Sequence, residues 1–316
     1  MFKTVDEAIH FIESQRAKRS FEDFQKIIER YQIPIDLKNV IHVSGTNGKG
    51  STVTFIKDLL MKQGYHVGTF TSPYIIKHHE RISVDGKPIS DDDLLRFINQ
   101  LLPLIQQEHL SMFEIDTLIM LYYFNELDLD YHIIECGIGG LHDKTNVIKS
   151  NVAVITNIGY DHQFMLGDTL LEIAHHKVGI VKENVPLFTT EQNKEILSYF
   201  KDYCTKHQST FYPLQVEKQY QYPYHLHFHQ KEYVLHLPTY QVSNLTLALN
   251  VVDYLCDLND EDIQAVIDDF KWPCRFEQFG HLYLDGAHNI SGIEALIQTI
   301  KERKLEDVGI VFSALM

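Results

Sequence analysis

The chain has 316 residues, 44% of them hydrophobic, which is enough to bury a large core in one large domain or two smaller ones. Its formal net charge of −15 argues against nucleic acid as the main partner, because binding a phosphate backbone needs clustered lysine and arginine. The amino terminus lacks an apolar signal region, and no stretch reaches about 18 uncharged apolar residues, so no membrane association is expected. The four cysteines are far apart without a C-x-x-C pair, which favours a reducing cytoplasm.

The first predicted strand, residues 39–43, leads into a glycine-rich loop that is followed by a predicted helix. Glycines let main-chain N–H groups approach phosphate oxygens, and the helix directs its positive end toward them. In this arrangement Lys49 adds a mobile charge and Ser51 can contact a phosphate-bound Mg²⁺. The loop therefore predicts a triphosphate site, and its residues are Gly45, Thr46, Asn47, Gly48, Lys49, Gly50 and Ser51.

The loop departs from the common pattern G-x-x-x-x-G-K-[ST]. Val43 stands where the first glycine of that pattern should be, and Gly50 separates Lys49 from Ser51. An ordinary glycine-rich turn is the alternative, but the strand before the loop and the helix after it favour a phosphate-binding loop.

Further along the chain, β-branched runs alternate with longer helical patterns. This alternation predicts a mostly parallel sheet covered by helices on both faces, which is an α/β fold. The later strands are expected at 66–71, 131–136, 152–158 and 186–190. One helix is expected to begin at Asp91 and another to run from Phe113 to Leu127.

After residue 210 the pattern changes to alternating aromatic and polar residues. Residues 222–237 predict an antiparallel hairpin added to the sheet, and a helix is expected over 243–255. The alternation places His225, His227 and His229 on one strand face. They could bind a metal, but a solvated strand face is favoured because no acidic residue or cysteine accompanies them.

The last part of the chain predicts a small, incomplete α/β unit. Residues 271–280 have the composition of a linker, and a strand, a helix and a strand are expected at 281–285, 292–303 and 308–312. The expected division is a large domain over 1–270, the linker, and the start of a second domain over 281–316. That segment is shorter than the 50 or so residues an independent domain usually needs.

Four further segments, together with the phosphate loop, resemble folylpolyglutamate synthase and dihydrofolate synthase of the Mur ligase family. Their order and spacing match from about residue 40 onward. The segments are Thr71-Ser72-Pro73-Tyr74 with Glu80-Arg81-Ile82; Glu135-Cys136-Gly137-Ile138-Gly139-Gly140 with Asp143 and Thr145-Asn146; Thr156-Asn157-Ile158-Gly159-Tyr160-Asp161-His162; and Asp285-Gly286-Ala287-His288-Asn289.

The resemblance implies a Mur-ligase-like, ATP-binding central domain and an ATP-dependent carbon–nitrogen ligase. Such a ligase adds L-glutamate to the γ-carboxyl of a folate through an acyl phosphate, and some members also convert dihydropteroate to dihydrofolate. Folate or pteroate and glutamate are the implied partners, with ATP and Mg²⁺ as cofactors. A cytoplasmic monomer is expected.

The resemblance also assigns individual roles. Lys49, His162 and Lys177 are the implied catalytic residues, and Lys177 aligns with a lysine that related ligases carry as a carbamate. The implied metal ligands are Ser51, Ser72, Glu135 and, for a second ion, His162. The implied nucleotide contacts in the second half are Gln241 and Asn244 near the adenine, Arg275 at the phosphates, and the pair Asp285 and His288.

Each of these residues also has a structural interpretation. Glu135 could be a solvated carboxylate at a strand end, His162 a helix cap, and Lys177 an exposed helical lysine. Ser72-Pro73 is a common pair at the start of a helix, a role that is compatible with metal binding.

Four positions depart from the family pattern. Leu141 stands where the family usually has arginine, His176 where it has glutamate, Cys274 where it has glycine and Ile290 where it has proline. These departures leave open a non-catalytic ATP- or folate-binding paralogue. A ligase acting on a cell-wall precursor is disfavoured by the folate-type segment around Ser72, and a P-loop kinase by the loop spacing.

Overall fold

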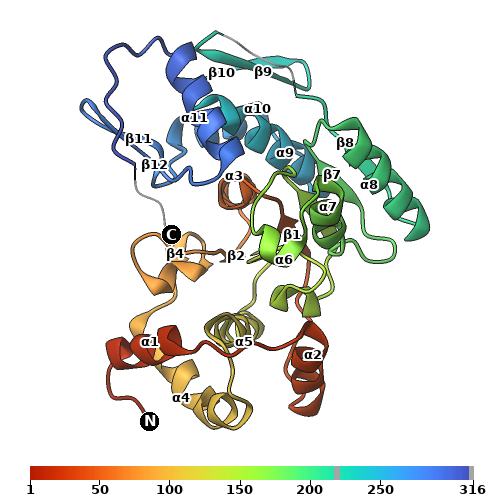
Figure 1. Cartoon of the computed structure of the whole chain (residues 1–316), viewed down its shortest axis with the longest axis vertical. Coiled ribbons are helices and arrows are strands. Elements are labelled where there is room, and N and C mark those ends of the chain that lie inside the picture. Colours follow the sequence, from red (N-terminus) through yellow and green to blue (C-terminus); the bar gives the residue numbers. More distant parts are fainter. Residues whose placement is uncertain (217–220, 313–316) are drawn as a thin grey trace.

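A computed structural model describes residues 1–216 and 221–312 (Figure 1). Within this part of the chain, the main sheet has eight strands in the order β4-β3-β2-β5-β1-β6-β7-β8. Strands β2, β5, β1, β6, β7 and β8 run parallel to their neighbours, and β3 and β4 add an antiparallel edge. The strands are β1 Val40–Ser44, β2 Val67–Phe70, β3 Ile82–Val84, β4 Lys87–Pro88, β5 Tyr131–Glu135, β6 Val152–Ile155, β7 Leu187–Thr189 and β8 Phe211–Pro213.

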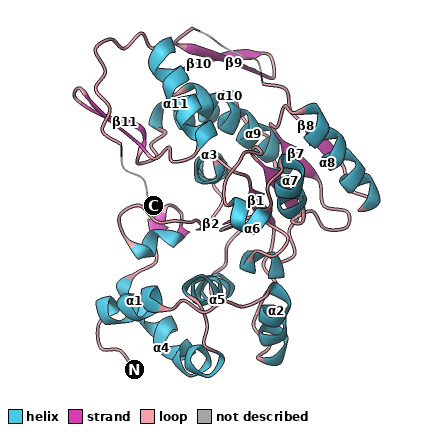
Figure 2. Ribbon diagram, in the orientation of Figure 1, coloured by secondary structure: helices cyan, strands magenta, loops and turns pink. Residues whose placement is uncertain are grey.

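Helices cover both faces of this sheet, as the alternating pattern predicted (Figure 2). One face packs against α3, α9 and α10, and the other against α1, α2, α4 and α5 in one half and α7 and α8 in the other. Their bounds are α1 Val5–Ser14, α2 Phe21–Arg30, α3 Lys49–Lys62, α4 Asp91–Glu108, α5 Met112–Asn125, α6 Gln163–Leu166, α7 Leu170–Val178, α8 Lys194–Lys206, α9 Thr239–Leu255, α10 Asp260–Asp269 and α11 Ile290–Glu302. Two 3₁₀ helices are η1 His78–Arg81 and η2 Lys144–Val147.

Side-chain caps fix the beginnings of several helices. The hydroxyls of Ser90, Ser111 and Thr169 accept hydrogen bonds from the third residue of α4, α5 and α7. In α5 and α7 the third residue is a glutamate, and its carboxylate accepts a hydrogen bond from the main-chain N–H of the cap residue. The cap of α7 therefore sets the start of the helix that carries Lys177.

The hairpin over 222–237 exists, but the prediction that it joins the main sheet is wrong. Strands β9 Tyr224–Phe228 and β10 Lys231–Leu235 form a separate two-stranded sheet. The inward residues of β9 and β10 pack in one core with α9 and α10. The alternation of aromatic and polar residues predicted the two strands correctly. Their buried faces pack on α9 and α10, so they do not pair with β8.

The C-terminal unit also differs from the prediction. Strand β11, Arg275–Phe279, lies within the segment interpreted as a linker and pairs in antiparallel fashion with β12, Leu282–Asp285. Helix α11 follows as expected, but residues 308–312 form no strand. Since no described strand lies alongside 308–312, their apolar residues have no ladder partner there.

None of the helices in residues 1–216 and 221–312 combines the length and apolar character needed to cross a membrane.

Candidate functional site at the phosphate loop

The predicted site residues gather where four parallel strands end. Val43 of β1 is in register with Glu135 of β5, and Ser44 is in register with Ile155 of β6. The loop after β1 therefore lies between the segments that follow β5 and β6. In sheets of this kind ligands bind at the carboxyl edge, next to the point where the strand order reverses.

The phosphate loop adopts backbone angles that need glycine. Gly45 and Gly48 have φ values of +146° and +84°, in the region that side chains disfavour. A Cβ atom at Gly45 would collide with the Thr156 hydroxyl, and one at Gly48 with the Asn244 amide. The glycines at these two positions are therefore required both by the backbone angles and by the close neighbours of the loop.

Lys49 and Glu135 meet at the mouth of this loop. The Lys49 Nζ atom lies 3.9 Å from Glu135 Oε1 and donates a hydrogen bond of 3.2 Å to the Gly45 carbonyl. The main-chain N–H of Ser72 donates to Glu135 Oε2 at 3.4 Å. Burial raises the pKa of Glu135 to about 7, and the charge of Lys49 opposes that rise. The alternative of a solvated carboxylate is wrong, since Glu135 is only 3% exposed.

Ser72-Pro73 does not begin a helix. Its peptide bond is cis, and the next helical segment is η1, starting at His78. The helix-start interpretation is therefore wrong. The segment instead turns at the end of β2 so that the main chain of Ser72 faces Glu135.

Lys177 is buried against the phosphate loop. Its Nζ atom donates a hydrogen bond of 2.8 Å to the carbonyl of Gly45, and the residue is 4% exposed. Burial and the nearby charge of Lys49 lower the pKa of Lys177 to about 7. The alternative of an exposed helical lysine is wrong, and the amine is partly neutral at physiological pH.

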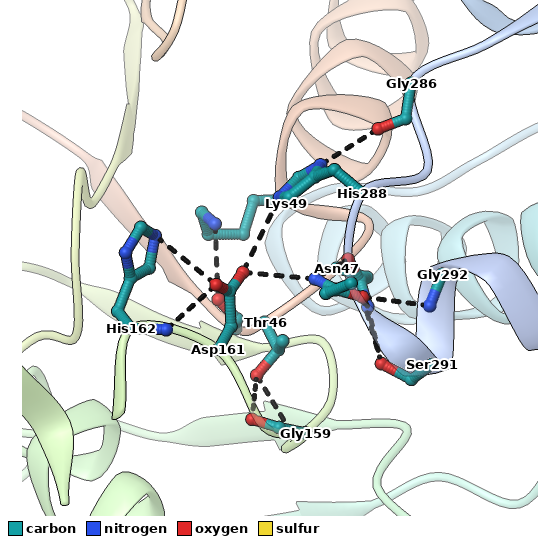
Figure 3. Close-up of polar contacts among 12 residues, drawn as sticks. Thr46, Asn47, Lys49, Gly159, Asp161, His162, Gly286, His288, Ser291 and Gly292 are labelled. Carbon is teal, nitrogen blue, oxygen red and sulfur yellow. Dashed lines mark hydrogen bonds and ion pairs between the residues drawn. The ribbon is translucent and has the colours of Figure 1, made fainter. Parts of the chain in front are cut away.

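His162 and His288 lie on either side of Asp161 (Figure 3). The His162 Nε2 and His288 Nε2 atoms lie 3.8 and 3.7 Å from Asp161 carboxylate oxygens. Burial raises the pKa of Asp161, but the hydrogen bond from Asn289 and the imidazoles outweigh it, so the net shift is downward. Burial lowers the pKa of His162, which keeps the ring neutral and able to bind a metal. His162 also stands at the N-cap of α6, but its side chain makes no capping hydrogen bond.

Gln241 and Asn244 lie beneath the loop. The Gln241 amide donates to the Ser51 hydroxyl at 3.1 Å, and Asn244 donates to Gln241 at 2.8 Å. Both side chains are buried, so they fix the first turn of α3. Their contact with an adenine stays a prediction.

Arg275 and Asp285 pair in the register of β11 and β12. Asp285 accepts hydrogen bonds from the Tyr240 hydroxyl at 2.7 Å and from the Phe276 and Ala287 main-chain N–H groups. The C-terminal unit lies close to the phosphate loop, since Asn289 and Asn47 exchange hydrogen bonds of 3.0 Å, and the charge of Arg275 opposes the rise that burial causes in the pKa of Glu135.

The sequence did not single out two neighbours of the loop. Trp272, the only tryptophan of the chain, packs so closely that a Cβ on Gly50 would lie 2.9 Å from its ring. Asn289 bonds the loop and Asp161. Both residues lie close in sequence to expected site residues, Trp272 to Arg275 and Asn289 to His288. Their residue types alone do not predict that they contact the phosphate loop.

Two of the four departures, Leu141 and His176, lie together. The main-chain N–H of Leu141 donates to the His176 carbonyl at 2.6 Å, and the Leu141 side chain packs on Gly179. The His176 ring lies 5.6 Å from that of His142. This neighbourhood is continuous with Lys177 through α7, so the missing arginine and glutamate belong to the surroundings of the site.

The three histidines of the hairpin are not part of it. His225 and His227 face solvent on β9, which confirms a solvated face, but His229 lies beyond the strand and pairs with Asp253. An acidic residue does accompany them, since Glu232 lies 3.2 Å from His225 and 3.4 Å from His227. Across the described ranges, no group of three or more His, Cys, Asp or Glu residues is placed to hold a metal ion by itself.

Comparison with known proteins identifies the class. Residues 43–252 match the Mur ligase middle domain. The chain therefore contains the middle domain of a Mur ligase, and the phosphate loop, Glu135 and Lys177 lie within it.

The particular family follows from whole-chain similarity. The dihydrofolate synthase/folylpolyglutamate synthase of Bacillus subtilis is 36% identical over 92% of this chain and 74% of its own length. A solved folylpolyglutamate synthase complex with AMPPCP and folate has a TM-score of 0.84 at 28% identity, over 95% of this chain and 80% of its own. A bifunctional folylpolyglutamate synthase/dihydrofolate synthase with Mn, AMPPNP and L-glutamate bound gives 0.80 at 26%, over 95% and 75%. The chain belongs to the folylpolyglutamate synthase family of Mur ligases.

Proposed function

We propose that this chain is an ATP-dependent ligase that adds L-glutamate to the γ-carboxyl of a reduced folate through an acyl phosphate. The observation that carries the proposal is the convergence of Lys49, Glu135 and Lys177 on one glycine loop. Relatives over nearly the whole chain are named for this reaction, and their solved complexes contain ATP analogues, folate or glutamate.

Transfer of the γ-phosphoryl group depends more on positive charge around the phosphates than on covalent catalysis by the protein. An oxygen of the γ-carboxylate attacks the γ-phosphorus of ATP, and the bond to the leaving ADP breaks. The glutamate amine then attacks the acyl carbon, loses a proton, and inorganic phosphate leaves. Lys49 lies where it can neutralise charge on the transferred phosphoryl, and the N–H groups of the loop hold the phosphates in place.

The residues present fit a magnesium ion. Glu135 is a buried carboxylate at the loop mouth, and burial raises its pKa to about 7, a penalty that a divalent cation would remove. Ser51, Ser72 and Glu135 would hold the ion, with His162 on a second one. The metal supplies charge stabilisation on the phosphates when bound.

Lys177 is proposed to carry a carbamate. A neutral amine attacks CO₂ and loses a proton, which leaves an anion able to bind Mg²⁺, and a pKa of about 7 leaves the neutral form well populated above neutral pH. Native mass spectrometry in bicarbonate buffer should show one added CO₂ that increases from pH 6 to pH 8 and disappears on acid denaturation. The Lys182→Ala control should keep the added mass and Lys177→Ala should lose it. An unmodified wild-type mass at pH 8 would rule the carbamate out.

Nucleotide binding should be visible through Trp272. The indole packs on Gly50 at the start of α3, and the chain has no other tryptophan. Titration with ATP and Mg²⁺ should therefore change the intrinsic fluorescence in a saturable manner. Gly50→Ala should weaken this binding, because the new methyl would lie 2.9 Å from the ring. Gly309→Ala is the control, since nothing lies within 4 Å of a Cβ there and no positive φ disfavours a side chain, so its binding should stay close to wild type.

The roles of Gln241, Asn244, Arg275, Asp285 and His288 toward the nucleotide are part of the proposal. His288 is the best placed of these, because its ring lies beside Asp161 at the edge of the loop. A cytoplasmic location is proposed because all four cysteines are free thiols. A monomeric state and activity on dihydropteroate stay predictions.

One assay separates this function from a non-catalytic paralogue. The chain is incubated with ATP, Mg²⁺, labelled glutamate and either tetrahydrofolate or dihydropteroate, and the products are identified by mass. A ligase forms ADP, phosphate and the glutamylated product only with both acceptor and glutamate present. Saturable binding of ATP without release of phosphate would establish the paralogue, which the substitutions at Leu141 and His176 favour.

A further inference from the structure

The amide of Asn289 connects three parts of the molecule. Its Nδ2 donates to Asn47 Oδ1 and to Asp161 Oδ2, each at 3.0 Å. Its Oδ1 accepts from Asn47 Nδ2 at 3.0 Å and from the Gly292 main-chain N–H at 2.9 Å. The phosphate loop, the turn that carries His162 and the first turn of α11 thus meet at one side chain.

We propose that Asn289 is a positioning residue that aligns His162 with the phosphate loop. The inference rests on the proposed function and goes beyond it, since Asn289 was not among the expected site residues. Asp161 is the link to His162, because it accepts the His162 main-chain N–H at 2.8 Å and faces its ring (Figure 3). Asn47 is the link to the loop, whose main chain is tied to Asn157.

Only asparagine satisfies all of these contacts. Both Nδ2 protons are donated, and Oδ1 accepts from Asn47, from the Gly292 N–H and, at 3.3 Å, from the Ser291 hydroxyl, so the amide is fully used. Serine could still cap the helix through its hydroxyl but could not donate to Asn47 and Asp161 together. Aspartate would cap the helix and place a second carboxylate against Asp161.

Helix α11 is held at its other end as well, which makes it a rigid support for Asn289. The hydroxyl of Tyr224 donates to Glu302, a residue that is 9% exposed. Arg303 donates to the carbonyl of His236 at 2.8 Å and stacks over Tyr222 and Phe276. A shift of the C-terminal unit would therefore be transmitted through α11 to both Asn47 and Asp161.

The test compares Asn289→Ser with Asn259→Ser. Asn259 caps α10 in the same way, and its side-chain hydrogen bonds go to Asp262 within the first turn of that helix, so it controls for capping alone. In the full chain, Asn289→Ser should lower kcat about tenfold, the loss expected for a hydrogen bond to a charged group, with a smaller change in KM for ATP and an unchanged melting temperature. Asn259→Ser should keep the wild-type kcat.

Hydrogen–deuterium exchange supplies a readout that does not depend on turnover. The amides of residues 45–48 and 158–163 should exchange faster in Asn289→Ser and remain unchanged in Asn259→Ser. Wild-type exchange together with wild-type kcat in Asn289→Ser would overturn the positioning role. So would a loss of activity matched by an equal fall in melting temperature in both variants. If the wild-type chain forms no product, the proposed function fails, and the exchange comparison still tests the role of Asn289.

Discussion

Replacing Lys49 with methionine should lower the rate of ADP formation by about 100- to 1000-fold, the usual loss when one preorganised charge is removed from a phosphoryl-transfer site. The Lys49 ammonium lies between the Gly45 carbonyl and Glu135, so it is already held over the loop. Methionine keeps most of the side-chain volume and removes the charge. The measurement is steady-state release of ADP with folate and glutamate both saturating.

Lys62→Met is the matched control. Lys62 lies on the same helix at its other end, and its contact with Asp269 is a solvent-exposed ion pair. Its substitution should leave turnover and melting temperature unchanged. Turnover within a factor of two of wild type in Lys49→Met would show that the Lys49 charge on the phosphate loop does not contribute to the reaction.

Replacing Glu135 with glutamine should abolish most magnesium-dependent turnover and, in the absence of metal, stabilise the fold at alkaline pH. The side chain is 3% exposed and Glu135 is the carboxylate beside Lys49. Glutamine retains the acceptor for the Ser72 N–H but carries no charge for the metal. We expect turnover to fall about 100-fold or more, which is within the range for losing one strong electrostatic contact. Added Mg²⁺ should recover little of it.

The pH dependence has a definite sign. Burial raises the pKa of Glu135 from 4.5 to about 7, so the folded protein without metal binds this proton more tightly than the unfolded chain. The stability that Glu135 contributes is fully present below pH 4.5 and is lost as pH rises through about 7. The loss is on the order of 3 kcal/mol at most.

Chemical unfolding without metal checks this sign. Glu135→Gln should match wild type near pH 4.5 and exceed it at pH 8. Binding of magnesium and nucleotide should show the opposite trend in wild type, becoming tighter from pH 6 to pH 8 as the carboxylate ionises, and should depend less on pH in Glu135→Gln. A wild-type stability that does not depend on pH over this range would mean that Glu135 is ionised and solvated in the fold.

The phosphate loop and the sheet were predictable because their signals are local. The glycines at positions 45 and 48 indicate a loop with positive φ angles, and β-branched runs separated by helical patterns predict a parallel sheet. The resemblance placed Glu135 and Ser72 in one site, and the structure brings them together because the carboxyl ends of parallel strands share one edge.

The burial of Lys177 and the contacts of Asn289 could not be predicted from a local sequence pattern. A lysine within His175-His176-Lys177 has the composition of an exposed helix face, and only the packing of α7 against the loop brings its amine to the Gly45 carbonyl. The pairing of the hairpin was misjudged for the same reason, since alternation specifies a strand but not its neighbour.

The sequence by itself determined the class of fold and the family, and it located the glycine loop proposed to bind phosphates, because each depends on residue types at short spacing. The tertiary structure decided which polar groups lose water and which distant segments meet. Desolvation brings the pKa values of Glu135 and Lys177 close to 7, and 242 residues separate Asn47 from the Asn289 amide that it contacts. Both effects depend on packing between elements, and a pattern within one element carries no record of what lies against it.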